Sequence, residues 1–304
     1  MKRRDFFELF LLAALWGGSF LFMRIAAPEF GPIALVELRV GVAAVFLVVV
    51  LSLRGNVAVL RQHVVPMTVV GLINSAVPFC LLAYATLSIT AGFASILNAT
   101  TPMWGAIVAW LWLRDRLTFW RVVGLVVGFA GIVVLTWDKA SFKADSSGLA
   151  ILAGLTATLF YGLAASYTKK QLTGVDPLAI ATGSQVGAAI VLLPLALLTW
   201  PTHQVSSAAW LSVLVMGVAS TGVAYILFFR LIANVGPARA ITVTFLVPIF
   251  AVLWGAVALD EKLTVQMFLG GIIVLAGTAL STGAIKPKFR VTIPDKLQSN
   301  ENNK

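Results

Sequence analysis

The stretch LRDRLTFWRVVGLVVGFAGIVVL (residues 113–135) has a second copy in the chain, LDEKLTVQMFLGGIIVLAGTAL (residues 259–280). In both copies a charged turn leads into Leu-Thr and then into an apolar run rich in glycine. The copies are 146 residues apart, and residues 97–135 align with residues 243–281 without a gap. A chain of 304 residues that repeats itself at nearly half its length is predicted to consist of two equivalent halves.

Proline, glycine and turn residues coincide between the halves, and they decide the alignment because apolar sequences match one another by chance. Toward the N-terminus the offset becomes 145, and there Arg39 falls opposite Ser184, so the chemistry is not repeated at that position. The pairs at an offset of 146 are Pro102/Pro248, Leu113/Leu259, Leu117/Leu263, Thr118/Thr264, Gly124/Gly270, Ala130/Ala276, Gly131/Gly277 and Gly71/Gly217, and those at 145 are Gly17/Gly162, Arg24/Lys169 and Pro32/Pro177. These pairs predict that the two halves share one backbone fold.

The composition predicts a membrane protein. Hydrophobic residues make up 60% of the chain and charged residues 11%, with a mean hydropathy of +0.96, whereas soluble domains carry about 25% charged residues. A helix of about 20 residues crosses a hydrocarbon core of about 30 Å. Ten apolar segments reach that length, namely 6–27, 33–53, 64–88, 91–113, 119–137, 148–168, 177–200, 207–233, 236–259 and 264–283.

Five predicted spans fall in each half, and an odd number requires the second half to enter the membrane in the opposite orientation. We therefore predict an all-α integral membrane protein with ten transmembrane helices, arranged as two inverted five-helix repeats over residues 1–140 and 147–285. The polar residues 286–304 are predicted to be a disordered cytoplasmic tail. Inverted repeats are a recurrent architecture of secondary transporters, whose substrate site lies near the midplane between the repeats.

Lysine and arginine residues gather on one side of the predicted spans. Seventeen of the 22 lie at the termini or in the connections on the same side, and the other side holds only Lys139, Lys143 and Lys262. Positively charged connections stay in the cytoplasm, so both termini are predicted to be cytoplasmic. Because the cations alternate with apolar runs, the net charge of +10 indicates membrane topology and not nucleic-acid binding.

Three motifs resemble the EamA-type branch of the drug/metabolite transporter superfamily. They are LLAALWGGSF (residues 11–20), the arginine in PIALVELRVGVAA (residues 32–44), and the repeated helix with proline, charged turn, Leu-Thr and glycine-rich helix. The resemblance covers essentially the whole chain and is specific for the superfamily, not for a substrate. It implies a multi-pass inner-membrane carrier that exports amino acids or other small metabolites by alternating access, with a cavity lined by helices 1, 3, 4, 6, 8 and 9.

Polar and aromatic side chains near the middle of the spans are candidates for the substrate site. Polar groups within spans need a partner or a cavity. Amides satisfy both an ammonium and a carboxylate group, and aromatic rings form apolar walls. Hydrogen bonds between helices explain any one of these residues equally well. Six that fall on the cavity helices of the family are predicted to bind substrate: Trp16, Asn74, Asn98, Tyr161, Tyr225 and Thr244.

Charged residues near the outer ends of the first two spans are a second set of candidates. Glu37 and Arg39 lie within the second span, on the order of 6 to 9 Å from its end, with Arg24 at a similar depth and Glu29 in the loop between. The hypothesis we favour is an ion-pair cluster that orients the two helices. The other is a gate, or a receptor for a substrate carboxylate, formed by Arg24, Glu37 and Arg39, with Glu37 as the acid that couples transport to protons.

Prolines and spaced glycines predict features of the backbone. Pro102 and Pro248 each remove an internal hydrogen bond, so they are predicted to form matched kinks, which are either hinges or static. The Gly-x-x-x-Gly motifs at residues 124–128 and 183–187 allow close approach of helices, within the chain in preference to between protomers. A monomer or a weak homodimer is therefore expected.

The sequence lacks the signatures of an enzyme. It has no Gly-x-x-x-x-Gly-Lys-Ser/Thr loop, and His63 and His203 lie at span ends, away from any metal-binding or Ser-His-Asp arrangement. Cys80 has no partner for a disulfide. We expect no catalytic residue, metal or cofactor, and a secondary transporter that exports small amphoteric metabolites. The alternative is a polytopic membrane protein that does not transport, either an accessory subunit or a membrane enzyme.

Overall fold

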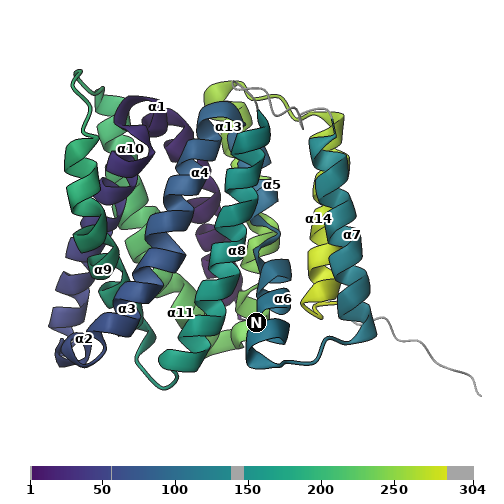
Figure 1. Ribbon diagram of the computed structural model, residues 1–304, viewed down its shortest axis with the longest axis horizontal. Helices are drawn as coiled ribbons and strands as arrows, with labels where there is room; N and C mark the ends of the chain where they lie inside the picture. Colours follow the sequence, from purple (N-terminus) through teal and green to yellow (C-terminus); the bar gives the residue numbers. More distant parts are fainter. Residues whose placement is uncertain (1, 56, 138–146, 286–304) are drawn as a thin grey trace, which may run out of the picture.

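Long apolar runs fold as helices throughout the described residues, 2–55, 57–137 and 147–285, of the computed structural model (Figure 1). No strand occurs among them, and seven of their helical runs are long and apolar enough to cross a membrane, followed by two shorter apolar helices. The seven are α1 (Arg3–Leu53), α3–η1–α4 (Val64–Ser88), α5–α6 (Ala91–Leu113), α7 (Phe119–Thr136), α8 (Ser147–Gln171), α9 (Pro177–Leu198) and α10–η2–α11 (Ser207–Val235); the shorter two are α13 (Val243–Leu259) and α14 (Val265–Ser281), and α2 (Ala58–Gln62) and α12 (Pro237–Ala240) are single turns.

Each predicted span contains described helix, although the spans predicted at 91–113 and 236–259 are each divided into two helices. A helix satisfies its own backbone groups, which is why apolar runs of this length form helices in lipid. The predicted tail, residues 286–304, and the lysines Lys139 and Lys143 of a predicted outer loop lie outside the described residues.

The longest helix, α1, is interrupted at Gly31, whose φ of 71° and ψ of 160° are not helical. Glycine adopts such angles because it has no Cβ, and the neighbouring Pro32 disfavours a helical conformation before it. Without the interruption, the 51 residues of α1 would extend about 75 Å, more than twice the core of a bilayer. Gly31 divides α1 into two parts that match the first two predicted spans.

Backbone irregularities recur in the two halves at the offset of 146. The π-helical turns η1 (Leu72–Ala76) and η2 (Val218–Val223) begin at equivalent positions. α6 (Thr101–Leu113) and α13 each end before a left-handed residue, Arg114 (φ 58°) and Asp260 (φ 53°), the only non-glycine residues of positive φ in the described part of the chain. Such residues are uncommon, so their recurrence shows that the halves share local backbone structure.

α7 and α14 lie side by side at one edge of the bundle (Figure 1) and pack through glycine. A Cβ on Gly131 would lie 2.7 Å from the backbone nitrogen of Val274, and a Cβ on Gly277 would lie 2.3 Å from that of Gly128. These are the same contact with equivalent positions exchanged. Since residue 128 faces 277 and residue 131 faces 274, the two helices run in opposite directions.

Two further contacts between the halves are reciprocal in the same way. At each, a glycine of one half lies directly against the backbone of the other half, which permits the close helix packing typical of membrane proteins. The contacts are Gly17 with Ala251 and its equivalent Gly162 with Gly105, and Gly71 with Ser184 and its equivalent Gly217 with Arg39. The centre of the protein is therefore an interface between the two halves.

Both Gly-x-x-x-Gly motifs make contacts within the chain, as predicted. The motif at residues 124–128 packs on α14, and the motif at residues 183–187 of α9 packs on Met67 and Thr68 of α3 (Val64–Gly71). A contact between copies of the chain is not needed to explain either motif.

Pro102 and Pro248, which are predicted to form matched kinks, lie at different positions in their helices. In the first half α5 (Ala91–Asn98) ends just before α6 begins, so Pro102 lies in the first turn of α6, where proline costs no helical hydrogen bond. Pro248 lies inside α13, and the break in the second half comes earlier, between α12 and α13. The expectation of equivalent kinks is therefore wrong, and a hinge role for either proline stays a prediction.

Candidate functional site

A cavity of about 670 Å³ lies between the two halves. Its walls come mainly from α1, from α4 (Val77–Ser88) with η1, from α5–α6, from α8, from α11 (Ala224–Val235) with η2, and from α13, with Arg121 of α7 and Ser281 of α14 added. These elements include all six helices that the family resemblance assigns to the cavity. Every residue predicted to bind substrate lines it: Trp16, Asn74, Asn98, Tyr161, Tyr225 and Thr244.

The two halves contribute residues at equivalent positions to the cavity lining, but the side chains at those positions differ in chemistry. Several residues of the first half that line the cavity are equivalent, at the offsets of the repeat, to residues of the second half that also line it. The two side chains of each equivalent pair differ in polarity or size. The pairs are Trp16/Tyr161, Asn74/Ser220, Phe79/Tyr225, Asn98/Thr244 and Thr101/Val247. One backbone arrangement is therefore used twice to build a wall whose two sides offer different groups.

The aromatic and amide groups of the lining contact each other in small sets. Asn74 Nδ2 donates a hydrogen bond to the Tyr225 hydroxyl at 3.2 Å, and the rings of Trp16 and Phe228 are 5.2 Å apart. These contacts hold the side chains in place without filling the cavity.

Four oxygen atoms of the lining are buried without a hydrogen-bond partner among the described residues. They are Ser19 Oγ, Asn98 Oδ1, Thr101 Oγ1 and Ser220 Oγ. A buried polar atom without a partner is costly, and four of them around one cavity indicate that a polar ligand or water occupies it. Asn98 is one of the six residues predicted to bind substrate, and Ser19 is a polar residue near the middle of a predicted span that is not among those six. Thr101 and Ser220 gave no signal, because Ser and Thr in a span usually bond to their own helix.

Arg39 is buried in the wall of this cavity, away from Arg24 and Glu37. Its Nε donates to Thr221 Oγ1 at 3.1 Å, Nη1 lies 3.9 Å from Met23 Sδ, and its guanidinium carbon lies 3.8 Å from the centre of the Phe79 ring. No carboxylate lies within 4.0 Å of it among the described residues. The ring and the hydroxyl stabilise the cation only in part, so the site has an unmet preference for an anion.

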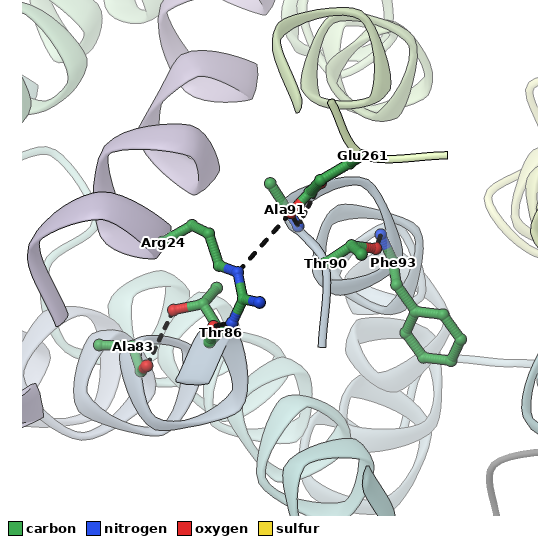
Figure 2. Close-up of polar contacts among 7 residues, drawn as sticks. All are labelled: Arg24, Ala83, Thr86, Thr90, Ala91, Phe93 and Glu261. Carbon is green, nitrogen blue, oxygen red and sulfur yellow. Dashed lines mark hydrogen bonds and ion pairs between the residues drawn. The ribbon is translucent and has the colours of Figure 1, made fainter. Parts of the chain in front are cut away.

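Arg24 lies beyond the cavity, in a cluster that joins four elements (Figure 2). Its Nε is 3.7 Å from Glu261 Oε1, and its Nη1 donates to the carbonyl oxygen of Thr86 at the end of α4. Both oxygens of Glu261 accept from the Ala91 N–H, the first of α5, at 3.1 and 3.0 Å. We call Arg24, Thr86, Ala91 and Glu261 the Arg24 cluster. It fastens α1 to the α4–α5 turn and to the turn between α13 and α14.

The ion-pair cluster predicted for the first two spans is therefore wrong. Glu29 instead accepts from the Ser206 N–H and hydroxyl, both at 2.6 Å, at the start of α10 (Ser207–Gly217), and these bonds lower the pKa of its carboxyl. Glu37 lies on a shallow apolar groove with Val45 and Val218, outside the cavity, and its Oε2 has no partner among the described residues. A coupling role for Glu37 stays a prediction.

The other end of the cavity is open. Arg121 and Lys169 line it there, and the Lys169 side chain is largely exposed. Lys169 Nζ lies 3.3 Å from Asp115 Oδ2 in the turn after α6. We call Lys169 and Asp115 the Lys169 pair. The cavity is thus accessible at the Lys169 end and covered at the Arg24 end.

The cavity has the room and the polar groups to hold a small polar molecule. The described residues contain no group of three His, Cys, Asp or Glu side chains that could hold a metal ion. Apolar helices long enough to cross a membrane, around a cavity with a buried cation and unpartnered oxygens, are the parts of a membrane transporter.

The chain belongs to the EamA-like transporter family, whose pattern matches residues 7–137 and 148–283. The uncharacterized transporter YoaV of Bacillus subtilis (strain 168) is 24% identical over 88% of this chain and 93% of its own length. The uncharacterized inner membrane transporter YedA of Escherichia coli (strain K12) is 24% identical over 91% of this chain and 90% of its own.

Two further similarities extend over most of the chain. A protein of Streptantibioticus cattleyicolor named a probable terminal-alkyne amino-acid exporter is 24% identical over 90% of this chain and 91% of its own length. A crystal structure of a protein with 18% sequence identity superposes with a TM-score of 0.65, over 93% of this chain and 98% of that chain, and shows that the fold occurs elsewhere.

Proposed function

We propose that this transporter exports small amphoteric metabolites, amino acids above all, by alternating access through the cavity between its two halves. The six lining residues predicted from the sequence bind the substrate, and Arg39 binds its carboxylate. The observation that carries the proposal is that buried arginine without a carboxylate partner among the described residues, in one cavity with unpartnered oxygens.

The architecture that this mechanism needs is ten transmembrane helices in two inverted repeats. Three features support it: the interruption of α1 at Gly31, the irregular turns at equivalent positions, and the antiparallel packing of α7 on α14 with equivalent contacts exchanged. An exchange of equivalent contacts between antiparallel helices is what a two-fold axis in the membrane plane produces.

The distribution of charge supports an orientation for this structure. Lys169, Arg121 and most other cations lie on one side, which the positive-inside rule assigns to the cytoplasm together with both termini. The cavity then opens to the cytoplasm, and the Arg24 cluster covers the extracytoplasmic end. An exporter binds its substrate in this state. The inner-membrane location of a relative, YedA, supports the same membrane for this chain.

The groups around the cavity fit a zwitterion. A guanidinium pairs with a carboxylate through charge-assisted hydrogen bonds, which are stronger than neutral ones. An ammonium group donates three hydrogen bonds and needs acceptors, and the unpartnered oxygens of Asn98, Thr101 and Ser19 are acceptors. The name of one relative, a probable amino-acid exporter, also supports this class of substrate.

Counterflow in proteoliposomes tests the proposal. The wild-type protein is expected to exchange an amino acid saturably but not the amine that remains after its carboxyl group is removed. Arg39→Gln is expected to lower the exchange at least about thirtyfold, because truncating one partner of a buried charge pair costs 2 kcal/mol or more. The matched control is Arg54→Gln at the exposed end of α1, which should exchange at the wild-type rate.

Two outcomes would contradict the proposal. Exchange of the amino acid by Arg39→Gln at the wild-type rate would exclude Arg39 as the carboxylate site. Exchange of the amine as fast as of the amino acid would exclude recognition of a carboxylate altogether.

A further inference from the structure

The Arg24 cluster and the Lys169 pair occupy equivalent positions at opposite ends of the cavity. Arg24 and Lys169 are 145 residues apart, and Asp115 and Glu261 are 146 residues apart, which are the two offsets of the repeat. In both cases the cation is on the first helix of its own half, and the carboxylate is in the charged turn of the other half. The same ion pair between the two halves therefore occurs twice, once at each end of the cavity.

We propose that these two ion pairs are the gates of the transporter. The Arg24 cluster holds the extracytoplasmic end closed in the present conformation, and the Lys169 pair performs the same task at the cytoplasmic end in the opposite conformation. The inference rests on the proposed alternating access, and Glu261, Asp115 and Lys169 are not among the residues proposed to bind the substrate.

The closure at the Arg24 end depends on a contact that the ion pair alone does not make. Glu261 reaches across to the first N–H of α5, while Arg24 reaches across to the last turn of α4 (Figure 2). The two charged residues together bind the α4–α5 turn on both of its sides. Opening this end requires the turn to leave α1 and the α13–α14 turn, so each of these hydrogen bonds must break.

At the Lys169 end the ion pair is formed, but the pair is exposed and lies beside the open mouth of the cavity. The equivalent of the α4–α5 turn is the connection between α11 and α12, which starts at Gly236. In the opposite conformation this connection is expected to pack against the Lys169 pair, although Pro237, the equivalent of Ala91, has no N–H to donate to Asp115. One end closes when the other opens because both pairs are parts of one two-fold arrangement.

Thiol labelling from outside the cell tests the gate without any substrate. Leu82 lines the cavity one helical turn before Thr86, so Leu82→Cys in a Cys80→Ala background reports access through the Arg24 end. Glu261→Gln is expected to raise the labelling rate by a membrane-impermeant maleimide about tenfold, within the range of coupling between a switch and its state. Arg24→Gln is expected to act in the same direction and provides a second variant if Glu261→Gln does not fold.

The matched control is Glu29→Gln, which removes another carboxylate at the same end but outside the Arg24 cluster. It is expected to leave the labelling rate at that of the reporter protein. Unchanged labelling in both gate variants would overturn the proposal, and so would an equal rise in Glu29→Gln. Raised labelling together with absent counterflow would refute the proposed substrates and leave the gate standing.

Discussion

The two ends of the cavity are fastened at equivalent positions, yet in different surroundings. The Lys169 pair is the shorter contact, with 3.3 Å between its charged atoms against 3.7 Å for Arg24 and Glu261. However, the side chains of Lys169 and Asp115 are 64% and 47% exposed, whereas those of Arg24 and Glu261 are 32% and 11% exposed. Exposed ion pairs contribute about 0.2–1 kcal/mol because water and salt screen them. Burial and added hydrogen bonds, and not the distance between the charges, therefore distinguish the Arg24 end from the Lys169 end.

One substitution between the halves explains part of this difference. Ala91 supplies the N–H that Glu261 binds, and the residue at the equivalent position of the second half is Pro237, which has no N–H. Asp115 therefore lacks the donor that its counterpart uses. In the proposed alternating access, the unequal fastenings would favour the conformation described here, which is closed at the Arg24 end.

The largest effect is expected from breaking the scaffold on which both ends depend. Gly277→Ala would place a Cβ 2.3 Å from the backbone nitrogen of Gly128, so α7 and α14 must separate. Overpacking of this kind costs about 1–3 kcal/mol or more. The thermal midpoint of the protein in detergent should fall clearly, and Gly131→Ala, the equivalent change in the first half, should lower it to a similar extent.

The same helix provides the control for that change. A Cβ on Gly271 of α14 would come no closer than 3.4 Å to any atom, and Gly→Ala within a helix is favourable by about 0.5–1 kcal/mol. Gly271→Ala is therefore expected to leave the thermal midpoint unchanged or raised. If Gly271→Ala destabilises the protein as much as Gly277→Ala, the contact between the halves is not what these glycines provide.

The positions of the helices were predictable because lipid imposes a strong constraint on the sequence. Apolar runs of about 20 residues form helices, and loops carry the charges. The six cavity residues were placed by the family resemblance in combination with their depth in the spans. The π-helical turns and the different environments of Pro102 and Pro248 gave no signal, since they result from packing of one helix on another.

For the charged residues, depth in the membrane alone gave wrong predictions of which side chains lie together. Arg39 and Glu37 are two residues apart, which on a helix of about 100° per residue places them on nearly opposite faces. Arg39 therefore faces the cavity, and Glu37 faces the groove with Val45. Glu261 was missed because its partner is far away in sequence. The repeat contained the signal, since Asp115 and Glu261 occupy the same place in the two charged turns.

A smaller effect is expected from breaking the fastening at the Lys169 end. Asp115→Asn should lower labelling of the Leu82→Cys reporter from outside by about two- to fivefold, as an exposed pair of about 0.2–1 kcal/mol allows. The direction is opposite to that of Glu261→Gln because the outward-open conformation loses its closure. At about 1 M salt the Debye length is near 3 Å, so the difference from the parent should vanish.

The salt dependence separates the two ends. The rise caused by Glu261→Gln should persist at high salt, since Glu261 is mostly buried and accepts hydrogen bonds from the Ala91 N–H. If Asp115→Asn raised the labelling as Glu261→Gln does, the two ends would not have opposite roles, and the comparison between them would fail.

The smallest effect is expected at Glu29, which joins the turn after the first span to α10 at the Arg24 end. Its pKa lies below the ordinary value of 4.5 because the Ser206 hydroxyl and N–H donate to the carboxylate. A lowered pKa in the folded state means that the bond contributes stability above pH 4.5 and that this contribution is lost as the pH falls through the folded pKa. Glu29→Gln should therefore lower the thermal midpoint by about two degrees at most at pH 7, and the variant and the wild type should converge as the pH falls through the folded pKa of Glu29. Because Glu29 lies outside the Arg24 cluster, the labelling rate of the reporter at pH 7 should be the same with and without Glu29→Gln. A midpoint difference that grows on acidification would show that Ser206 stabilises the protonated carboxyl instead.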